Sequence, residues 1–370
     1  MVSLGGTERA ETPAGAMMTG SETFSRWRFS TPQQVISGAG ALAALPGLLA
    51  ELGAERAFVL STRSLRPHLG PVEQALGGAH RGTFTEIGQH TPAPDVEQAT
   101  ARAEGADLLV SFGGGSVIDA AKAVAYEIGR PPQVAVPTTL SSGEFTPFAG
   151  VTDPETRKKG GVYAPNILPH AVIHDASLTR HTPEALWLST GMRAMDHALE
   201  TLWARSPHPY ADTLAAEALR LLWTELPASR DPENIRAREA CLLASWFSVS
   251  GIMNVGTRLS HPIGHQVGSF WHVPHGVTSC IALPTVMRHL APATQGAQRR
   301  IAEIFGVPTP VAAADALEQF IAALDVPTRL RETGAVRAEL PLVAEAVREE
   351  LAGSGAEPGE ALEGLLEQMW

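Results

Sequence analysis

Short apolar runs alternate with amphipathic stretches from about Gln33 to Thr179. Apolar runs of this length predict buried strands, and stretches with an apolar residue at every third or fourth position predict helices. Because strands that alternate with helices favour βαβ units, we expect a doubly wound parallel sheet. The expected strands are 57–60, 106–112, 134–136 and 171–173, and the expected helices include 41–52 and 96–104.

Beyond Thr179 the strand pattern stops, and segments rich in Ala, Leu, Glu and Arg follow. The change places a domain boundary near Thr179 to Pro183. We expect an α/β domain over residues 22–180 and an all-α domain over residues 181–370. Helices in the second domain are expected over 209–222, 235–248, 310–324 and 335–351.

Composition and charge limit what the chain can be. Its 370 residues, 44% hydrophobic and 18% charged, are enough for two cores. The net charge of −11 argues against a nucleic-acid partner or an anionic membrane surface. Only Cys241 and Cys280 occur, which excludes a disulfide framework. Residues 1–21 lack the apolar segment of a signal peptide, so we expect a disordered leader there and a cytoplasmic protein.

A glycine-rich turn, Gly113-Gly114-Gly115-Ser116, follows the expected strand 106–112 and opens an Ala-rich helix. Glycines let the backbone pass close to a diphosphate, and a helix N-terminus offers N–H groups and a partial positive charge. Ser116 and Asp119 fit a capping box at the start of this helix. We predict that the turn binds phosphate. The alternative is a tight turn that binds nothing.

An earlier segment, Gly38 to Ala43, matches the dinucleotide fingerprint G-x-G-x-x-G/A. We reject it as the main phosphate loop because a poor strand precedes it. The next expected strand, 57–60, also ends in Ser61-Thr62-Arg63 without an acidic residue. The hydroxyl-rich segment Pro137–Gly143 is a better second element of the site, because ligands of open α/β sheets bind at the carboxyl ends of strands.

Histidines gather in the second half of the chain. His261 and His265 are four residues apart and share one face of a helix, and His275 follows in Pro274-His275-Gly276. His197 lies further upstream, and His272 is interpreted as a bystander. One such histidine is usually structural, but four in one domain favour proton transfer or metal ligation.

Arg193 lies four residues before His197, where an Asp or Glu would make two metal ligands on one helix turn. A guanidinium cannot ligate a metal, and it repels a dication. Two interpretations stay open. One is a salt bridge to Asp196, worth roughly a few tenths of a kcal/mol. The other is an anion clamp for a substrate carboxylate.

These motifs, in this order, resemble the iron-containing alcohol dehydrogenase family from about Val35 to at least Arg329. The resemblance implies a dehydroquinate synthase-like architecture, NAD(H) or NADP(H) as cofactor, and a homodimer. Besides the glycine turn and the histidines, it rests on Pro137-Thr138-Thr139 and Asp175-Ala176-Ser177-Leu178-Thr179. The positions that match the family's cofactor site are Gly114, Gly115, Ser116, Asp119, Thr138, Thr139, Ser142, Lys159 and Leu178.

In this family an Asp and three His hold a metal, and the matching positions here are Arg193, His197, His261 and His275. His265 matches a family histidine near the substrate that does not ligate the metal. The arginine makes a metal doubtful and points to the maleylacetate reductase branch, which works without one. The resemblance thus implies an NAD(P)H-dependent oxidoreductase of aromatic compound catabolism that reduces maleylacetate to 3-oxoadipate. The expected catalytic side chains are Arg193, His197, His261, His265 and His275.

The chemistry suits these side chains. Hydride goes to the carbon β to the ketone, and negative charge builds on the enolate oxygen. Arg193, His261 and His275 could hold that charge and the carboxylates, and a histidine could deliver the proton. The alternatives are a metal-dependent alcohol dehydrogenase with Asp196 as a shifted ligand, a lyase resembling 3-dehydroquinate synthase, and a non-catalytic nucleotide-binding protein. Asp196 adjoins His197, and adjacent side chains on a helix diverge by about 100°. This divergence argues against Asp196 as a shifted metal ligand beside His197.

Coenzyme choice depends on the end of the strand 57–60. An acidic side chain there would bind the adenosine ribose and repel a 2′-phosphate. The sequence has Ser61-Thr62-Arg63, with no carboxylate and one cation. We therefore expect both NADH and NADPH to be used, with less than about a hundredfold preference.

Overall fold

The computed structural model describes residues 31–154, 159–353 and 362–370. The expected leader over residues 1–21 lies outside this part of the chain. The described residues divide into two compact units. The first holds residues 31–154, 159–182 and 231–243, and the second holds 183–230, 244–353 and 362–370. The division is therefore not a single cut in the sequence, and helix α7 (Ile235–Val249) begins in the first unit and ends in the second.

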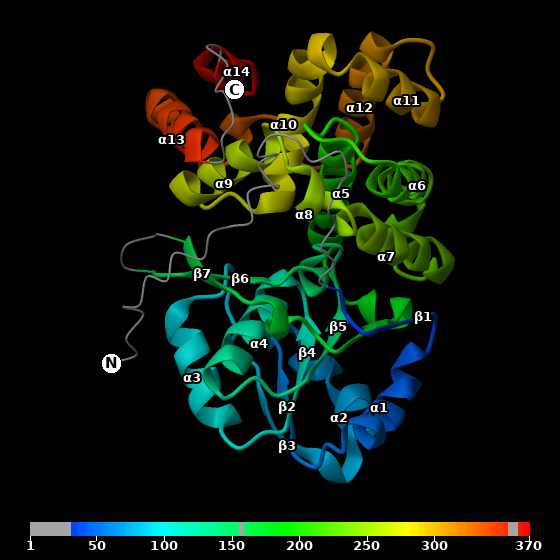
Figure 1. Ribbon diagram of the computed structural model, residues 1–370, viewed down its shortest axis with the longest axis vertical. Helices are drawn as coiled ribbons and strands as arrows, with labels where there is room; N and C mark the ends of the chain where they lie inside the picture. Colours follow the sequence, from blue (N-terminus) through cyan, green and yellow to red (C-terminus); the bar gives the residue numbers. More distant parts are fainter. Residues whose placement is uncertain (1–30, 155–158, 354–361) are drawn as a thin grey trace, which may run out of the picture. The chain divides into compact units, whose positions relative to one another are not determined.

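The first unit contains a six-stranded parallel sheet in the order β1-β8-β5-β4-β2-β3 (Figure 1). The expected doubly wound sheet is confirmed. The two strands that the apolar pattern did not predict, β1 and β3, lie at the two edges, where half-exposed strands carry polar residues. The strands are β1 (Gln34–Ser37), β2 (Ala57–Leu60), β3 (His80–Phe84), β4 (Leu108–Gly113), β5 (Gln133–Pro137) and β8 (Ala171–His174).

Helices cover both faces of this sheet (Figure 1). One apolar core joins the strands to α1 (Leu45–Leu52) and α2 (Gly70–Leu76). The other joins them to α3 (Ala93–Ala103) and α4 (Gly115–Glu127). An antiparallel hairpin of β6 (Phe148–Thr152) and β7 (Lys159–Tyr163) packs on α4. The two cores fix the carboxyl ends of β4 and β5, where the glycine-rich turn and the hydroxyl-rich segment begin.

The described part of the second unit contains helices and no strand, as expected. The helix expected over 335–351 is shorter, because Arg337–Glu339 is a 3-10 turn and the α-helix begins at Leu340. The helices are α5 (Glu184–Leu202), α6 (Pro209–Glu225), α8 (Ile252–Val255), α9 (Ser260–Trp271), α10 (His275–Leu290), α11 (Gln295–Phe305), α12 (Pro310–Ala323), α13 (Leu340–Gly353) and α14 (Leu362–Gln368).

Close packing of α10 on α5 explains the glycine of Pro274-His275-Gly276. A Cβ atom on Gly276 would lie 2.4 Å from the carbonyl oxygen of Ser189. Only glycine lets the first turn of α10 approach the backbone of α5 so closely. The motif therefore places His275, at the start of α10, beside the helix that carries Arg193 and His197.

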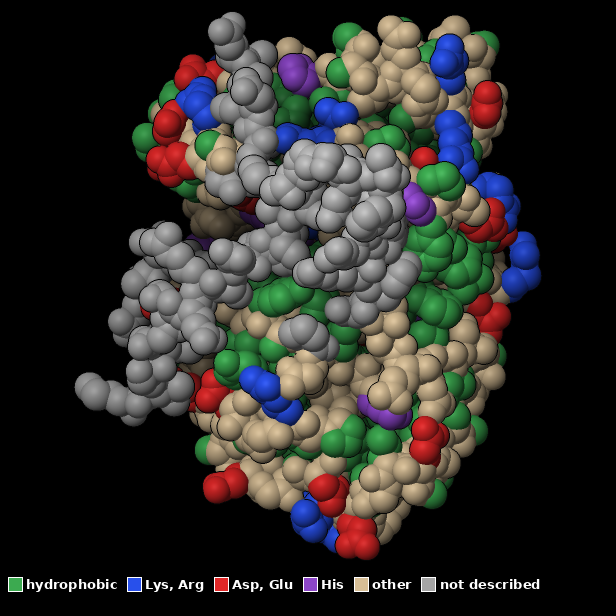
Figure 2. Space-filling model, in the orientation of Figure 1, with side chains coloured by type: hydrophobic (Ala, Val, Ile, Leu, Met, Phe, Trp, Pro, Cys, Tyr) green, Lys and Arg blue, Asp and Glu red, His purple; other side chains and the backbone are tan. Residues whose placement is uncertain are grey.

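Acidic and basic side chains are interspersed over the face seen in Figure 2, rather than gathered into a patch of one sign. Among the described residues no single helix is long and apolar enough to cross a membrane. One bent pair, Ile235–Val255 with Ser260–Trp271, passes the test of length and composition with an angle of 105° between its parts.

Candidate active site

Two loops of the first unit pack together at the carboxyl ends of β4 and β5. A Cβ atom on Gly114 would lie 2.9 Å from the side chain of Thr139, and one on Gly115 would lie 3.0 Å from that of Ser141. The backbone N–H of Thr138 donates to the carbonyl oxygen of Gly113 at 2.9 Å. Glycine is thus required for the contact, and the residues expected on both loops are brought to one place.

The start of α4 differs from the expected capping box. The helix begins at Gly115 with Gly114 as N-cap, and no side chain caps it. Ser116 Oγ instead accepts a hydrogen bond from the backbone N–H of His90 at 3.0 Å. The Asp119 carboxylate accepts from the N–H of Gly150 at 3.1 Å and also binds a buried lysine. Because no side chain caps the first turn, the N–H groups of Gly115 and Ser116 are available to an anion, whereas that of Val117 donates to Gly114.

The backbone N–H groups of the earlier segment Gly38–Ala43 bind a carboxylate side chain of the protein itself. The N–H groups of Gly40 and Leu42 each donate to the Asp175 carboxylate at 3.1 Å. The hydroxyl of Ser177 donates to the same carboxylate at 2.6 Å. A carboxylate of the protein therefore occupies the position that a phosphate would need, which gives a physical reason for rejecting this segment.

The other expected cofactor residues are less closely grouped. Ser142 is buried and adopts a left-handed conformation with φ of 61°. Leu178 is partly buried against the core that α1 and α2 form with the sheet. Lys159 opens β7, but its side chain lies outside what the structure describes.

The residues that follow β2 pair with a carboxylate that the sequence pattern did not predict there. Arg63 forms an ion pair with Glu86, and Arg66 lies 2.9 Å from the same carboxylate. The hydrogen bond from Arg63 lowers the pKa of Glu86. Glu86 follows β3, which pairs with β2 in the sheet, and β3 was not expected. The corner thus contains two cations and one carboxylate.

In the second unit the four expected histidines form a continuous row. The ring centroids of His197 and His261 are 5.2 Å apart, those of His261 and His265 are 6.1 Å apart, and those of His265 and His275 are 5.7 Å apart. His197 comes from α5, the next two from α9, and the last from α10. Three helices therefore bring the expected histidines together.

Arg193 makes the salt bridge that was one of its two interpretations. Its Nη1 lies 3.0 Å from Asp196 Oδ2, which also accepts a hydrogen bond from Ser279 at 2.7 Å. The Asp196 side chain is fully buried and that of Arg193 is 12% exposed. The other N–H groups of Arg193 make no hydrogen bond to the described residues, so they can still bind a carboxylate.

Burial decides the charge of two histidines. It lowers the pKa of His197 well below its usual value, and the neighbouring Arg193 lowers it further. The pKa of His261 is lowered by burial, by Arg193 and by the other three histidines. Both rings are therefore neutral near neutral pH. In the described part of the chain, Nδ1 of each has no hydrogen-bond partner.

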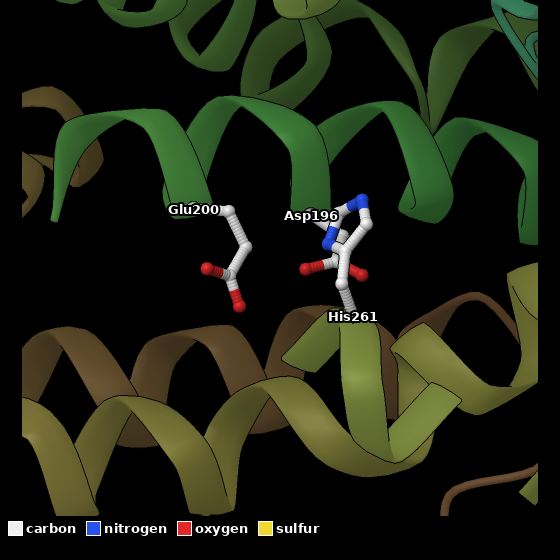
Figure 3. Close-up of side chains that lie close together, drawn as sticks. All are labelled: Asp196, Glu200 and His261. Atoms are coloured by element: carbon white, nitrogen blue, oxygen red, sulfur yellow. The ribbon is translucent and has the colours of Figure 1, made fainter. Parts of the chain in front are cut away.

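One group of side chains in the described residues has donor atoms close enough to hold a metal ion: Asp196, Glu200 and His261, all within 4.8 Å of one another (Figure 3). The Glu200 carboxylate already accepts hydrogen bonds from the backbone N–H groups of Arg258 and Ser260. Burial and the nearby Asp196 raise the pKa of Glu200 to about 7.

The four positions at which the resembled family holds its metal do not fit one here. Arg193 is a fixed cation, and neither His197 nor His275 belongs to the convergent group among the described residues. In the group that does converge, backbone N–H groups engage both oxygens of Glu200 and Arg193 engages Asp196 Oδ2, whereas Asp196 Oδ1 has no hydrogen-bond partner among the described residues. The donor set thus disfavours a dication at the family's site.

Sequence reasoning missed three side chains near this row. Glu200 lies seven residues after Arg193 and four after Asp196, so helical spacing could have placed it on the same face of α5. Ser279 and Glu350 carry no local signal, because they reach Asp196 and His265 from distant positions in the chain. The distance between His265 Nδ1 and Glu350 Oε1 is 2.8 Å.

Two family models match most of the chain. One described as iron-containing alcohol dehydrogenase matches residues 32–176. The other, described as Fe-containing alcohol dehydrogenase family, C-terminal, matches residues 187–363.

The chain is also similar in sequence and in structure to individual proteins of this family. Maleylacetate reductase of Rhizobium sp. (strain MTP-10005) is 33% identical over 319 residues, which is 85% of this chain and 89% of that protein. The crystal structure of maleylacetate reductase from Agrobacterium tumefaciens has a TM-score of 0.82 and 31% identity, covering 94% of this chain and 99% of that one. A putative alcohol dehydrogenase from Ralstonia eutropha JMP134 has a TM-score of 0.85 and 30% identity, covering 95% and 98%.

Proposed function

The chain belongs to the iron-containing alcohol dehydrogenase family, and from this premise we propose that it is a maleylacetate reductase that works without a metal. It is an NAD(P)-dependent oxidoreductase, as members of the family are. The substrate is an unsaturated oxo-dicarboxylate, and the product is 3-oxoadipate. The curated relatives with this name support the substrate, and the chemistry of the second unit supports the absence of a metal.

The observation that carries the proposal is the environment of Arg193. Its guanidinium stands where the family places an acidic metal ligand. Asp196, which also accepts a hydrogen bond from Ser279, pairs with it in a nearly buried site. A guanidinium binds a carboxylate through two parallel N–H groups, and this charge-assisted bonding contributes about 1.5–3 kcal/mol. The arginine suits a dicarboxylate substrate better than a neutral alcohol.

The residues of this chain then have separate tasks. The glycine turn at Gly114 and Gly115 binds the diphosphate of the cofactor, which supplies a hydride when bound. Arg193 holds a substrate carboxylate. The neutral rings of His197 and His261 donate hydrogen bonds to the oxygen on which enolate charge develops. A histidine of the row delivers the proton to the carbon next to the ketone.

The test is a turnover assay with maleylacetate and each reduced nicotinamide. The protein is assayed before and after prolonged incubation with a chelator, and its iron and zinc contents are measured. We expect well under one metal ion per chain and an unchanged rate after chelation. A stoichiometric metal whose removal abolishes turnover would contradict metal independence. Turnover of simple alcohols but not of maleylacetate would contradict the substrate.

A second candidate is a metal-dependent alcohol dehydrogenase or aldehyde reductase, which the convergence of Asp196, Glu200 and His261 favours. A metal there could use Asp196 Oδ1, but it would lie close to the positive charge of Arg193 and would compete with two backbone N–H groups for Glu200. Titration of the chelated protein with Zn²⁺ or Fe²⁺ distinguishes the candidates. Stoichiometric binding that Glu200→Gln abolishes would favour the alcohol dehydrogenase.

The proposal also covers location, assembly, partners and coenzyme choice. We place the enzyme in the cytoplasm, as a homodimer, with a small carboxylate as substrate and neither nucleic acid nor membrane as partner. We expect use of both coenzymes because two arginines follow β2, and the single carboxylate of Glu86 neutralises only part of their positive charge. Size measurement in solution tests the homodimer directly.

A further inference from the structure

Glu350 holds one of the four histidines from the far end of the chain. His265 Nδ1 lies 2.8 Å from Glu350 Oε1, and the side-chain amide of Gln266 donates to the other carboxylate oxygen at 2.7 Å. The two partners of Glu350 are adjacent on α9, which packs against α13. Both carboxylate oxygens are thus engaged by α9, and the carboxylate is held from two sides.

We infer that Glu350 is a positioning residue that presents His265 as the proton donor of the reduction. The inference rests on the proposed function, because it assigns the donor of that reaction. A carboxylate only accepts hydrogen bonds, so Nδ1 of His265 must carry the hydrogen. The hydrogen bond at Nδ1 thereby fixes the orientation and the tautomer of the ring, and Nε2 is left to face a substrate. Functional histidines are generally held in this way, by a partner at the ring nitrogen that does not react.

His265 is better placed for this task than His197 and His261. His197 and His261 are held neutral near neutral pH, since burial lowers the pKa of both. A neutral imidazole is a poor donor to carbon, because giving up its proton would leave an anion. The His265 side chain is 45% exposed and its Nδ1 faces a carboxylate, so water can reach the ring while Glu350 fixes its orientation.

The step balances in atoms and charge. The reduced nicotinamide supplies a hydride to the carbon β to the ketone, and the carbon–carbon π electrons move to form the enolate. The enolate carbon next to the ketone takes the proton from Nε2 of the His265 imidazolium, which becomes neutral. Water then returns a proton to Nε2 while Glu350 retains the hydrogen bond at Nδ1.

The first experiment does not depend on activity. With ¹⁵N-labelled histidine, the ring of His265 is assigned by its loss in His265→Gln and its tautomer is recorded. We expect the Nδ1–H form in the wild type. Glu350→Met, which keeps the length of the side chain but removes both acceptors, should lose that form. An unchanged tautomer in this variant overturns the inference.

The second experiment measures turnover. Glu350→Met should lower kcat by about 10- to 100-fold and raise the solvent deuterium isotope effect, because proton transfer becomes slower. KM and the dissociation constant of the cofactor should stay within about twofold, since neither binding step uses His265 as an acid. Glu350→Gln keeps an acceptor for Nδ1 but not the charge, so it should recover part of the loss.

Two matched variants control for damage to the helix. Glu349→Met makes the same change at the next residue, which is exposed, and should leave kcat unchanged. Glu339→Met removes a different contact to α9, the hydrogen bond from Trp271 at 2.7 Å, without touching a histidine. Equal loss of kcat in Glu339→Met and Glu350→Met would show a structural role and overturn the inference. If the wild type fails to reduce maleylacetate, the proposed function fails, and the tautomer still decides the role of Glu350.

Discussion

The glycine turn of the first unit and the histidine row of the second unit offer polar groups to a ligand by different means. At the turn the groups are backbone N–H donors of α4, and glycine is needed because Thr139 and Ser141 pack against the backbone. In the row the groups are side chains from α5, α9 and α10, and their charges depend on burial and on one another.

The difference shows which changes each half tolerates. A backbone site loses its ligand when a side chain enters its space, but its charge does not depend on distant residues. A side-chain site keeps its volume when one residue is changed to another of similar size. The pKa values of the remaining side chains change, however, because the buried groups interact with one another. Four variants test this contrast, from the largest expected effect to the smallest.

Gly114→Val should have the largest effect. Its Cβ would lie 2.9 Å from Thr139, and the added methyl groups would keep a diphosphate from the first turn of α4. Loss of two charge-assisted hydrogen bonds costs about 3–4 kcal/mol, so the dissociation constant of the cofactor should rise by about 100- to 1,000-fold. Fluorescence titration with NADH measures it.

Gly40→Ala is the matched control in the segment that Asp175 occupies. Its Cβ meets open space, and its φ of 79° costs an alanine about 1 kcal/mol of stability. Cofactor affinity should not change. A similar loss of affinity in both variants would mean that the rejected segment also binds the cofactor.

Arg193→Met comes second. We expect a fall of about 10- to 200-fold in kcat/KM for maleylacetate, the equivalent of 1.5–3 kcal/mol of charge-assisted bonding, with an unchanged dissociation constant for the cofactor. Arg193→Lys should recover only part, because an ammonium lacks the planar pair of donors. Equal rates with a neutral aldehyde before and after the change, together with no loss for maleylacetate, would leave only the salt bridge to Asp196.

Glu200→Gln tests the electrostatics of the row through pH. Burial and Asp196 raise the pKa of Glu200 from 4.5 to about 7 in the folded protein, so the folded state keeps a proton that the unfolded chain has lost. Stability from this group is therefore present at low pH and is lost as pH rises through that window. The glutamine imitates the protonated acid. The free energy of unfolding of the variant, relative to that of the wild type, should therefore rise by about 1–3 kcal/mol over the same pH window.

Denaturant unfolding of both proteins at about pH 5 and about pH 8 checks this expectation. Titration of the buried histidines affects both proteins alike and cancels in the difference. A stability difference that stays constant between the two pH values would show that Glu200 is ionised throughout.

Glu86→Gln should have the smallest effect. Removing this exposed carboxylate frees Arg63 and Arg66 to meet a 2′-phosphate, so the preference for NADPH over NADH should rise by about 3- to 10-fold. Steady-state kinetics with both coenzymes measure the ratio. An unchanged ratio would place the adenosine ribose elsewhere.

The sequence by itself determined the features that depend on neighbours along the chain. Alternating apolar runs placed β2, β4, β5 and β8, and the periodicity beyond Thr179 placed α6, α7 and α12 within a few residues. Edge strands such as β3 escaped, because polar residues hide the apolar pattern of a strand that is covered on one side only.

The tertiary structure decided which polar groups meet. Asp175 reaches Gly40 across 135 positions, Glu350 reaches His265 across 85, and Ser279 reaches Asp196 across 83. Even at the glycine turn, whose position the sequence predicted, the capping box failed because His90 took the hydroxyl of Ser116. Backbone conformation follows from local sterics and spacing. The partner and charge of a buried side chain follow from whatever the fold brings within a few ångströms, and a single sequence does not encode that at any fixed spacing.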